Sequence, residues 1–269
     1  MMKTQLDTQE LLKIASKLVQ KIGDALLTHR ISFMSKNYNR DIKSEADIYS
    51  ESFLIEELQK QTGLPILSEE AGIAQEPQKG EMCWIIDPLD GTMNFTRSFP
   101  LACVSVALWQ DDNPILGVIY DFNHQKIYTG IVGHSAECNG NTIQVSDIAD
   151  ASQAILATGF PVGRSYDSPA LIQFVQQVKQ FKKIRMIGSA AMSLAYVASG
   201  VFDVYHEEDI MIWDVAAGLA IVKASGGDIR IQPGSKLHSV NCVASNYKLI
   251  DGFESYKTTD LGIIIGKVL

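Results

Sequence analysis

Helical and strand-like patterns of apolar residues alternate in the first third of the chain. Apolar side chains recur every three or four positions over residues 8–29, which predicts an amphipathic helix. Residues 46–61 have the length of a second helix, which ends before a glycine and a nearby proline. Two short apolar runs, at 65–68 and 82–86, are typical of buried strands.

The middle of the chain has the pattern of antiparallel strands. Three β-rich runs, at 103–109, 115–122 and 126–131, are separated by short polar turns. This spacing predicts a meander. The pair Asn139-Gly140 indicates a further tight turn.

From about residue 150 onward, strand and helix patterns alternate. Strands are predicted at 155–158, 184–187, 202–205 and 240–244. Helices are predicted at 168–182, 189–199 and 213–225. Such alternation predicts sheets covered by layers of helix. We expect two tightly packed halves, residues 1–145 and 146–269, that form one functional unit.

Composition narrows the class of protein. The 269 residues carry a net charge of −8 and no basic run, so nucleic-acid binding is not expected. The N-terminal residues are polar, and the longest strongly apolar stretch (215–224) is too short to span a membrane. Four widely spaced cysteines are typical of a reduced, cytoplasmic protein.

Paired acids follow the strand predicted at 82–86. Because Pro88 has no N–H to donate, we expect the chain to leave the sheet there, with Asp87 and Asp90 at the strand's carboxyl end. Gly91 permits a tight turn, and Thr92 could begin a helix whose free N–H groups suit a phosphate. Two carboxylates beside an anion site are typical of Mg²⁺-assisted phosphoryl chemistry. The alternative is a helix cap plus a turn aspartate.

Two further acids also follow apolar segments. Glu69 and Glu70 come directly after the strand predicted at 65–68, and Glu70 is expected to face solvent. Asp214 precedes a helix of small residues and, taken alone, fits a helix cap better than a metal ligand. Three acid-bearing strand ends in one chain nevertheless favour a shared site.

The segments WIIDPLDGTMNF, LSEEAG and WDVAAGLAIVKASGG together resemble the inositol monophosphatase family of Mg²⁺-dependent, lithium-sensitive phosphatases. Shorter matches are KSEAD (43–47), CNG (138–140) and GSAA (188–191), so the resemblance runs from about residue 36 to 245. Ser44 stands where the family often has threonine. The resemblance implies a five-layered αβαβα sandwich of the inositol monophosphatase and fructose-1,6-bisphosphatase type, usually a homodimer.

The resemblance also implies a role for each matching residue. Two or three Mg²⁺ ions would be held by Glu69, Asp87, the Leu89 carbonyl, Asp90 and Asp214. The catalytic group, which positions the attacking water, would be Glu69, Thr92 and Asp47. The phosphorylated substrate would contact Asp90, Gly91, Thr92, Ser189, Ala190 and Glu207, with Glu207 on its hydroxyl groups.

Several readings of the function stay open. The substrate implied is a small phosphorylated metabolite, foremost inositol monophosphate or a similar polyol phosphate, hydrolysed by water directly. Fructose 1,6-bisphosphate, 3′-phosphoadenosine 5′-phosphate, histidinol phosphate and NADP are alternatives within the family. Haloacid-dehalogenase phosphatases carry D-x-D-G-T with a nucleophilic first aspartate, but here two residues separate the acids. A non-catalytic sensor of a phosphorylated ligand is an alternative of another class.

Overall fold

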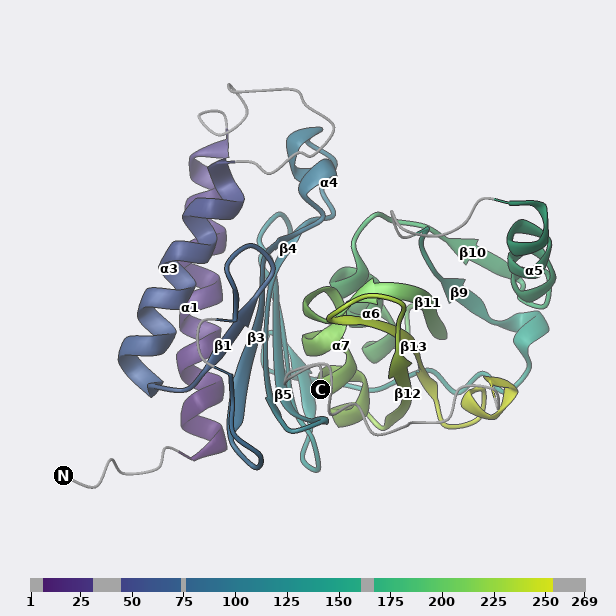
Figure 1. The fold of residues 1–269 in the computed structure, drawn as a ribbon. Coiled ribbons are helices and arrows are strands. Elements are labelled where there is room, and N and C mark those ends of the chain that lie inside the picture. Colours follow the sequence, from purple (N-terminus) through teal and green to yellow (C-terminus); the bar gives the residue numbers. More distant parts are fainter. Residues whose placement is uncertain (1–6, 31–44, 74–75, 161–166, 254–269) are drawn as a thin grey trace.

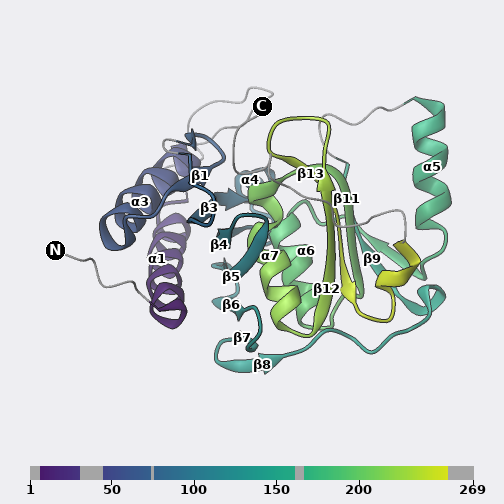
Figure 2. The ribbon, with the colours of Figure 1, turned by 60° about the horizontal axis from the view of Figure 1, so that its bottom comes forward.

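The computed structural model describes residues 7–30, 45–73, 76–160 and 167–253. Their elements form five layers in the order helix, sheet, helix, sheet, helix (Figure 1). The outer layers are α1 with α3 on one side and α5 on the other. Helices α6 and α7 lie between the two sheets (Figure 2). The expected αβαβα sandwich is therefore confirmed.

Helices α1 (Thr8–Thr28) and α3 (Glu45–Thr62) cover the outer face of the first sheet. The Asp7 side chain caps α1 by accepting a hydrogen bond from the Glu10 N–H at 2.7 Å. Most of the apolar side chains in the three- and four-residue pattern of α1 are buried, among them Leu11, Leu18 and Ile22. Both helices were predicted within two residues of their observed ends.

The first sheet has eight strands in the order β2-β1-β3-β4-β5-β6-β7-β8. Their bounds are Ile66–Ser68 (β1), Gly72–Ile73 (β2), Met82–Asp90 (β3), Cys103–Gln110 (β4), Asn113–Asp121 (β5), Lys126–Ile131 (β6), Ala136–Cys138 (β7) and Asn141–Ile143 (β8). Only the β1–β3 pair is parallel among the described pairings, so the predicted meander is confirmed. In β4, Val104 and Val106 face the outer helices while Ala107 and Trp109 face α7, so both faces of the sheet are buried.

The expectation that the chain leaves the sheet at Pro88 was wrong. Strand β3 runs on to Asp90, which pairs with Cys103 of β4 after a register shift that begins at Asp87. Pro88 sits inside this irregularity, where no ladder N–H is required of it. Asp87 and Asp90 therefore both belong to the strand, and α4 (Thr92–Thr96) starts just beyond them.

The middle layer consists of α6 (Ala190–Ala198) and α7 (Ile212–Ala224). Nearly every side chain of α7 is buried, because this helix contacts sheet on both sides. Small residues make the approach close: a Cβ at Gly117 of β5 would collide with the Ala217 backbone. This packing brings the N-terminal end of α7 to the carboxyl end of β3.

The second sheet has the order β10-β9-β11-β13-β12. Its strands are β9 (Ile155–Ala157), β10 (Lys183–Arg185), β11 (Val204–Met211), β12 (Gly227–Pro233) and β13 (Ser239–Asn246). Helix α5 (Ser168–Val178) packs on its outer side with the short 3₁₀ turns Ala151–Gln153 and Ile250–Phe253 nearby. No helix in the described part of the chain has the length and apolar character needed to cross a bilayer. Residues 1–6 lie outside that part.

Two features of the second sheet differ from prediction. Strand β12 was not predicted, since no strand was expected between the helix at 213–225 and the strand at 240–244. Gly226 turns the chain at φ +89°, and Gly227 already begins β12. Strand β11 was predicted to end at residue 205 and instead reaches Met211. It does so through a bulge in which Asp209 has φ +55°.

Candidate active site

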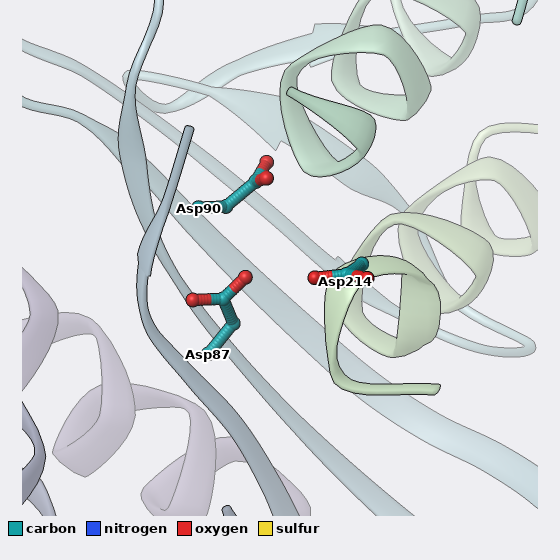
Figure 3. A group of neighbouring side chains, drawn as sticks. All are labelled: Asp87, Asp90 and Asp214. Carbon is teal, nitrogen blue, oxygen red and sulfur yellow. The ribbon is translucent and has the colours of Figure 1, made fainter. Parts of the chain in front are cut away.

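Three carboxylates converge where the two sheets meet the middle helices. Asp87 and Asp90 come from the end of β3, and Asp214 comes from the first turn of α7 (Figure 3). Each offers an oxygen atom, and these atoms lie within 4.8 Å of one another. Asp87 and Asp90 are buried and Asp214 is half-buried. Residues from distant parts of the chain thus share one acidic centre.

Asp214 is not the cap of its helix. The N-cap position of α7 is Met211, which makes no side-chain capping bond. Asp214 is the third residue of the helix, and its carboxylate lies beside Asp87 and Asp90 (Figure 3). The positive end of the helix dipole favours a carboxylate there. The interpretation of Asp214 as a simple cap was therefore wrong.

One oxygen of Asp90 is close to three donors from two segments, the start of α6 and strand β4. Its Oδ2 accepts hydrogen bonds from the Ser189 hydroxyl and from the Ala191 N–H at 2.8 Å, and the Cys103 thiol lies at 3.7 Å. Ser189 is also the N-cap of α6 and accepts from Met192. These contacts fix the Asp90 carboxylate against the start of α6.

The pKa values of all three aspartates are raised. Burial is the largest cause for each of them. For Asp87, the charges of Glu69, Asp90 and Asp214 add to the rise. The hydrogen bonds from Ser189 and Ala191 oppose the rise at Asp90. The cluster therefore holds more negative charge than its surroundings stabilise.

This excess of negative charge indicates whether the residues of the cluster fit a metal ion. Carboxylate oxygens are the ligands that Mg²⁺ prefers, and a divalent cation would offset the repulsion that raises these pKa values. Three carboxylates from two elements, β3 and α7, also bring their oxygens within 4.8 Å of one another. The residues present fit a hard divalent cation.

Glu69 lies beside this cluster rather than within it. It occupies the turn between β1 and β2, where its side chain is exposed, and its charge raises the pKa of both Asp87 and Asp214. Its neighbour Glu70, which was expected to face solvent, is only partly exposed. The Glu70 N–H donates to the Glu51 carboxylate at 3.1 Å.

A hydroxyl group links three of the predicted residues. Thr92 Oγ1 lies 2.9 Å from Asp47 Oδ1 and 3.0 Å from the Leu89 carbonyl oxygen. Since one hydroxyl carries one proton, it donates to one of these acceptors at a time. Asp47 is buried on α3. Its neighbour in the matching segment, Ser44, lies outside the described residues.

Gly91 connects β3 to α4 in a conformation that suits glycine. Its φ is +83°, and a Cβ added there would lie 2.8 Å from the Leu101 carbonyl oxygen. A side chain at this position would therefore be strained and crowded. The backbone can turn directly from Asp90 into the N-terminus of α4.

A pocket of about 220 Å³ opens beside the acidic centre. Five of the predicted site residues line it: Asp90, Ser189, Ala190, Glu207 and Asp214. Its other lining residues were not among the predicted site residues, although Gly188 belongs to the matching segment GSAA; they are Thr158, Gly159, Phe160, Gly188, Ser193 and Ile210. Most of these are small or apolar and belong to loops, so no charge pattern pointed to them.

Glu207 forms one wall of this pocket. It is buried, and its Oε2 accepts a hydrogen bond from the Tyr205 hydroxyl at 2.8 Å. Gly159 lies against it, since a Cβ there would be 2.6 Å from both carboxylate oxygens. The glycine leaves room for the acid at the pocket.

The acidic segment that follows Glu207 is partly structural. Asp209 Oδ1 accepts hydrogen bonds from the Ser235 N–H at 2.5 Å and the Ser239 hydroxyl at 3.3 Å. It thereby ties the bulge in β11 to the turn between β12 and β13. His206 is buried, with Gln177 Nε2 at 3.0 Å from its Nδ1.

The fold and the acidic centre define a phosphatase of the layered αβαβα class. The chain belongs to the inositol monophosphatase family, whose model matches residues 7–256. The resemblance inferred from the short motifs is therefore confirmed. A divalent metal requirement is implied for the family, and the three-carboxylate centre agrees with it.

Individual relatives carry two kinds of name. The chain is 34% identical to the inositol-1-monophosphatase of Mesorhizobium japonicum over 210 residues, which is 77% of this chain and 79% of that one. It is 35% identical to the Nus factor SuhB of Xylella fastidiosa over 220 residues, 80% and 79% of the two chains. Among solved structures, the inositol monophosphatase of Anabaena (Nostoc) sp. superposes with a TM-score of 0.78 at 30% identity, covering 92% of this chain and 95% of that one.

Proposed function

We propose that this protein is a Mg²⁺-dependent phosphomonoesterase that hydrolyses inositol monophosphate or a similar polyol or sugar phosphate. The observation that carries the proposal is the convergence of Asp87, Asp90 and Asp214 within 4.8 Å beside a pocket of about 220 Å³. Such a centre combines ligands for a cation with space for a small substrate. Membership of the family supports the same activity.

Two or three Mg²⁺ ions would be held by Glu69, Asp87, the Leu89 carbonyl, Asp90 and Asp214. When bound, they would neutralise phosphate charge and make a water molecule more acidic. Asp87 is central to this set because both Asp90 and Asp214 raise its pKa. By the same family expectation, Li⁺ at millimolar concentration would inhibit the enzyme.

The protein's own contribution to the reaction would be to bind the phosphate and orient the water. The N-terminus of α4, at Gly91 and Thr92, would contact the phosphate with Ser189 and Ala190. The Thr92 hydroxyl, held by Asp47 at 2.9 Å, would receive a proton from the water as its own proton passes to the carboxylate. Glu69, which the resemblance assigns to the same group, would help position the water.

Glu207 would select the substrate. Its carboxylate is buried at the pocket, and the Tyr205 hydroxyl donates to one of its oxygens. An acceptor in that position favours a substrate that carries hydroxyl groups, as inositol does. Fructose 1,6-bisphosphate, 3′-phosphoadenosine 5′-phosphate, histidinol phosphate and NADP are the alternative substrates.

A second candidate function is a role that needs no turnover, such as sensing a phosphorylated ligand. It is favoured by relatives that are named Nus factor SuhB rather than phosphatase. The retained set of acids argues for catalysis instead. Turnover of any phosphomonoester with Mg²⁺ separates the two.

We also propose that the protein is a cytoplasmic homodimer in which residues 1–145 and 146–269 act together. The four cysteines are free, in agreement with a reduced compartment. Asn94 Nδ2 donates to the Ile187 carbonyl at 2.8 Å, and the neighbouring side chains Met93 and Met186 are about half exposed. This apolar surface supports self-association, which light scattering of the purified protein would test.

The experiment that tests the proposal is a panel of the named phosphomonoesters, assayed for phosphate release with Mg²⁺ and with EDTA. We expect release from inositol monophosphate that requires Mg²⁺, and none from Asp87→Asn. Phosphate release by the wild type in EDTA would contradict the metal requirement. If the wild type releases phosphate from none of these substrates, the alternative function, sensing of a phosphorylated ligand, is favoured.

A further inference from the structure

One face of α3 carries three polar side chains that are all buried. Asp47, Ser50 and Glu51 are 3%, 0% and 8% exposed. Ser50 and Glu51 follow Asp47 by three and four residues, which places all three on one side of the helix. Buried polar groups are costly unless they are hydrogen-bonded. The hydrogen-bond partners of these three side chains therefore indicate the role of this face of α3.

Each of the three side chains contacts a different segment of the acidic centre. Asp47 accepts from Thr92, and the Ser50 hydroxyl donates to the Pro88 carbonyl at 2.7 Å. The Pro88 carbonyl lies in the backbone between Asp87 and Leu89. Helix α3 thereby holds both the end of β3 and the start of α4.

Glu51 contacts the third segment, the turn between β1 and β2. Its Oε1 accepts hydrogen bonds from the Ser68 hydroxyl and from the N–H groups of Glu70, at 3.1 Å, and Ala71, at 3.0 Å. These donors flank Glu69 on both sides. Hydrogen bonds to a carboxylate are stronger than those between neutral groups, so the three fix the turn firmly.

The strands on either side of this turn are short. Strand β1 has three residues and β2 has two, and Ser68 pairs with Gly72 directly across the turn. The exposed side chain of Glu69 has no burial to fix its place. A side chain that binds a metal ion must be held near its coordinating geometry by hydrogen bonds and packing from neighbouring residues.

We propose that Glu51 is a positioning residue that orders the turn between β1 and β2 and so fixes Glu69 for metal binding. The proposal rests on the proposed metal centre. It assigns to Glu51 no contact with substrate or metal, only the hydrogen bonds to Ser68, Glu70 and Ala71.

The test is direct measurement of Mn²⁺ binding by electron paramagnetic resonance, which detects the free ion and needs no turnover. We expect Glu51→Ala to weaken binding by roughly 10–100-fold, the range found for groups that orient a ligand. Glu51→Gln keeps an oxygen for the same donors and should recover most of the affinity. The exposed Glu56→Ala on the same helix is the matched control and should bind as the wild type does.

A double variant separates positioning from a general loss of structure. If Glu51 acts through Glu69, adding Glu51→Ala to Glu69→Gln should weaken binding by no more than about twofold further. If the double variant instead loses affinity by the product of the two single losses, the proposal is overturned. It is also overturned if Glu51→Ala has a lower melting temperature but an unchanged Mn²⁺ affinity. If the wild type binds no Mn²⁺, the proposed metal centre is wrong, and the proposed role of Glu51 is wrong with it.

Discussion

The Thr92 hydroxyl lies 2.9 Å from Asp47 Oδ1, although the two residues are 45 positions apart in the chain. One belongs to the first turn of α4 and the other to the first turn of α3. The same hydroxyl is 3.0 Å from the Leu89 carbonyl oxygen. The hydroxyl can therefore donate its proton to Asp47, as the proposed role of Thr92 in positioning the attacking water requires.

This arrangement predicts the behaviour of Thr92→Ala. We expect kcat to fall by about 100-fold, the lower end of general acid–base effects, with KM nearly unchanged. Asp47→Asn should have the same effect more weakly, because the amide still accepts a hydrogen bond. Steady-state kinetics at saturating Mg²⁺ measures both. A raised KM with normal kcat would assign Thr92 to binding alone.

The acidic centre predicts different outcomes for two of its aspartates. Asp87→Asn should nearly abolish turnover, because Asp87 interacts with the three other proposed metal-binding carboxylates, Glu69, Asp90 and Asp214. Asp214→Asn should raise the Mg²⁺ concentration for half-activity by roughly the 10–100-fold that weakened coordination costs. Titration of activity with Mg²⁺ distinguishes the two. An Asp214→Asn variant that unfolds with normal Mg²⁺ dependence would give Asp214 a purely structural role.

Metal choice gives another prediction. Mg²⁺ should support activity and Ca²⁺ should not, because Ca²⁺ takes more ligands at longer distances and would misplace the water. Phosphate release with each ion after removal of metal by EDTA provides the measurement. Equal rates with both ions would show that octahedral geometry is not needed.

Without metal, the stability of the fold should depend on pH through Asp87. Burial raises its pKa, so the folded state binds a proton more readily than the unfolded state does. Stability should then increase as pH falls from neutral toward the ordinary aspartate pKa near 4, and decrease as pH rises through the elevated pKa.

Asp87→Asn removes this penalty. In EDTA at neutral pH the variant should melt about 2–4 °C higher for each pKa unit of elevation, which corresponds to about 1.4 kcal/mol. Scanning calorimetry of the wild type and of Asp87→Asn in EDTA across pH 5–8 provides the measurement. A lower melting temperature for Asp87→Asn at neutral pH would contradict the explanation that burial and repulsion between acids raise the pKa of Asp87.

Local chemistry explains which features could be predicted from the sequence. The Asp87–Thr92 segment combines proline, glycine and two acids within six positions, so its turn and its chemistry are visible without the fold. The amphipathic pattern of residues 8–29 similarly predicted α1 because one side of that helix is buried. Apolar strands with polar turns predicted the meander.

Other features depend on contacts between distant residues. Pro88 stays in β3 because β4 pairs again with Asp90, a fact that no local rule contains. Asp214 looks like a cap until the packing of α7 places it beside Asp87. Gly159 and Phe160 line the pocket only because their loop faces Glu207, and neither has a chemical signature of its own.

The central claim is that water displaces the alcohol at the acidic centre in one step, with no phosphate attached to the protein. The Asp87 Oδ1 already accepts the Leu89 N–H at 2.9 Å, and Asp87 is proposed to hold metal rather than attack phosphorus. A haloacid-dehalogenase mechanism would use that first aspartate as a nucleophile.

The most direct measurement is the hydrolysis of a chiral thiophosphate ester in isotopically labelled water. One displacement inverts the configuration at phosphorus and two displacements retain it. We predict inversion, with no ³²P label on Asp87 after an acid quench. Retention of configuration, or label trapped on Asp87, would contradict direct attack by water.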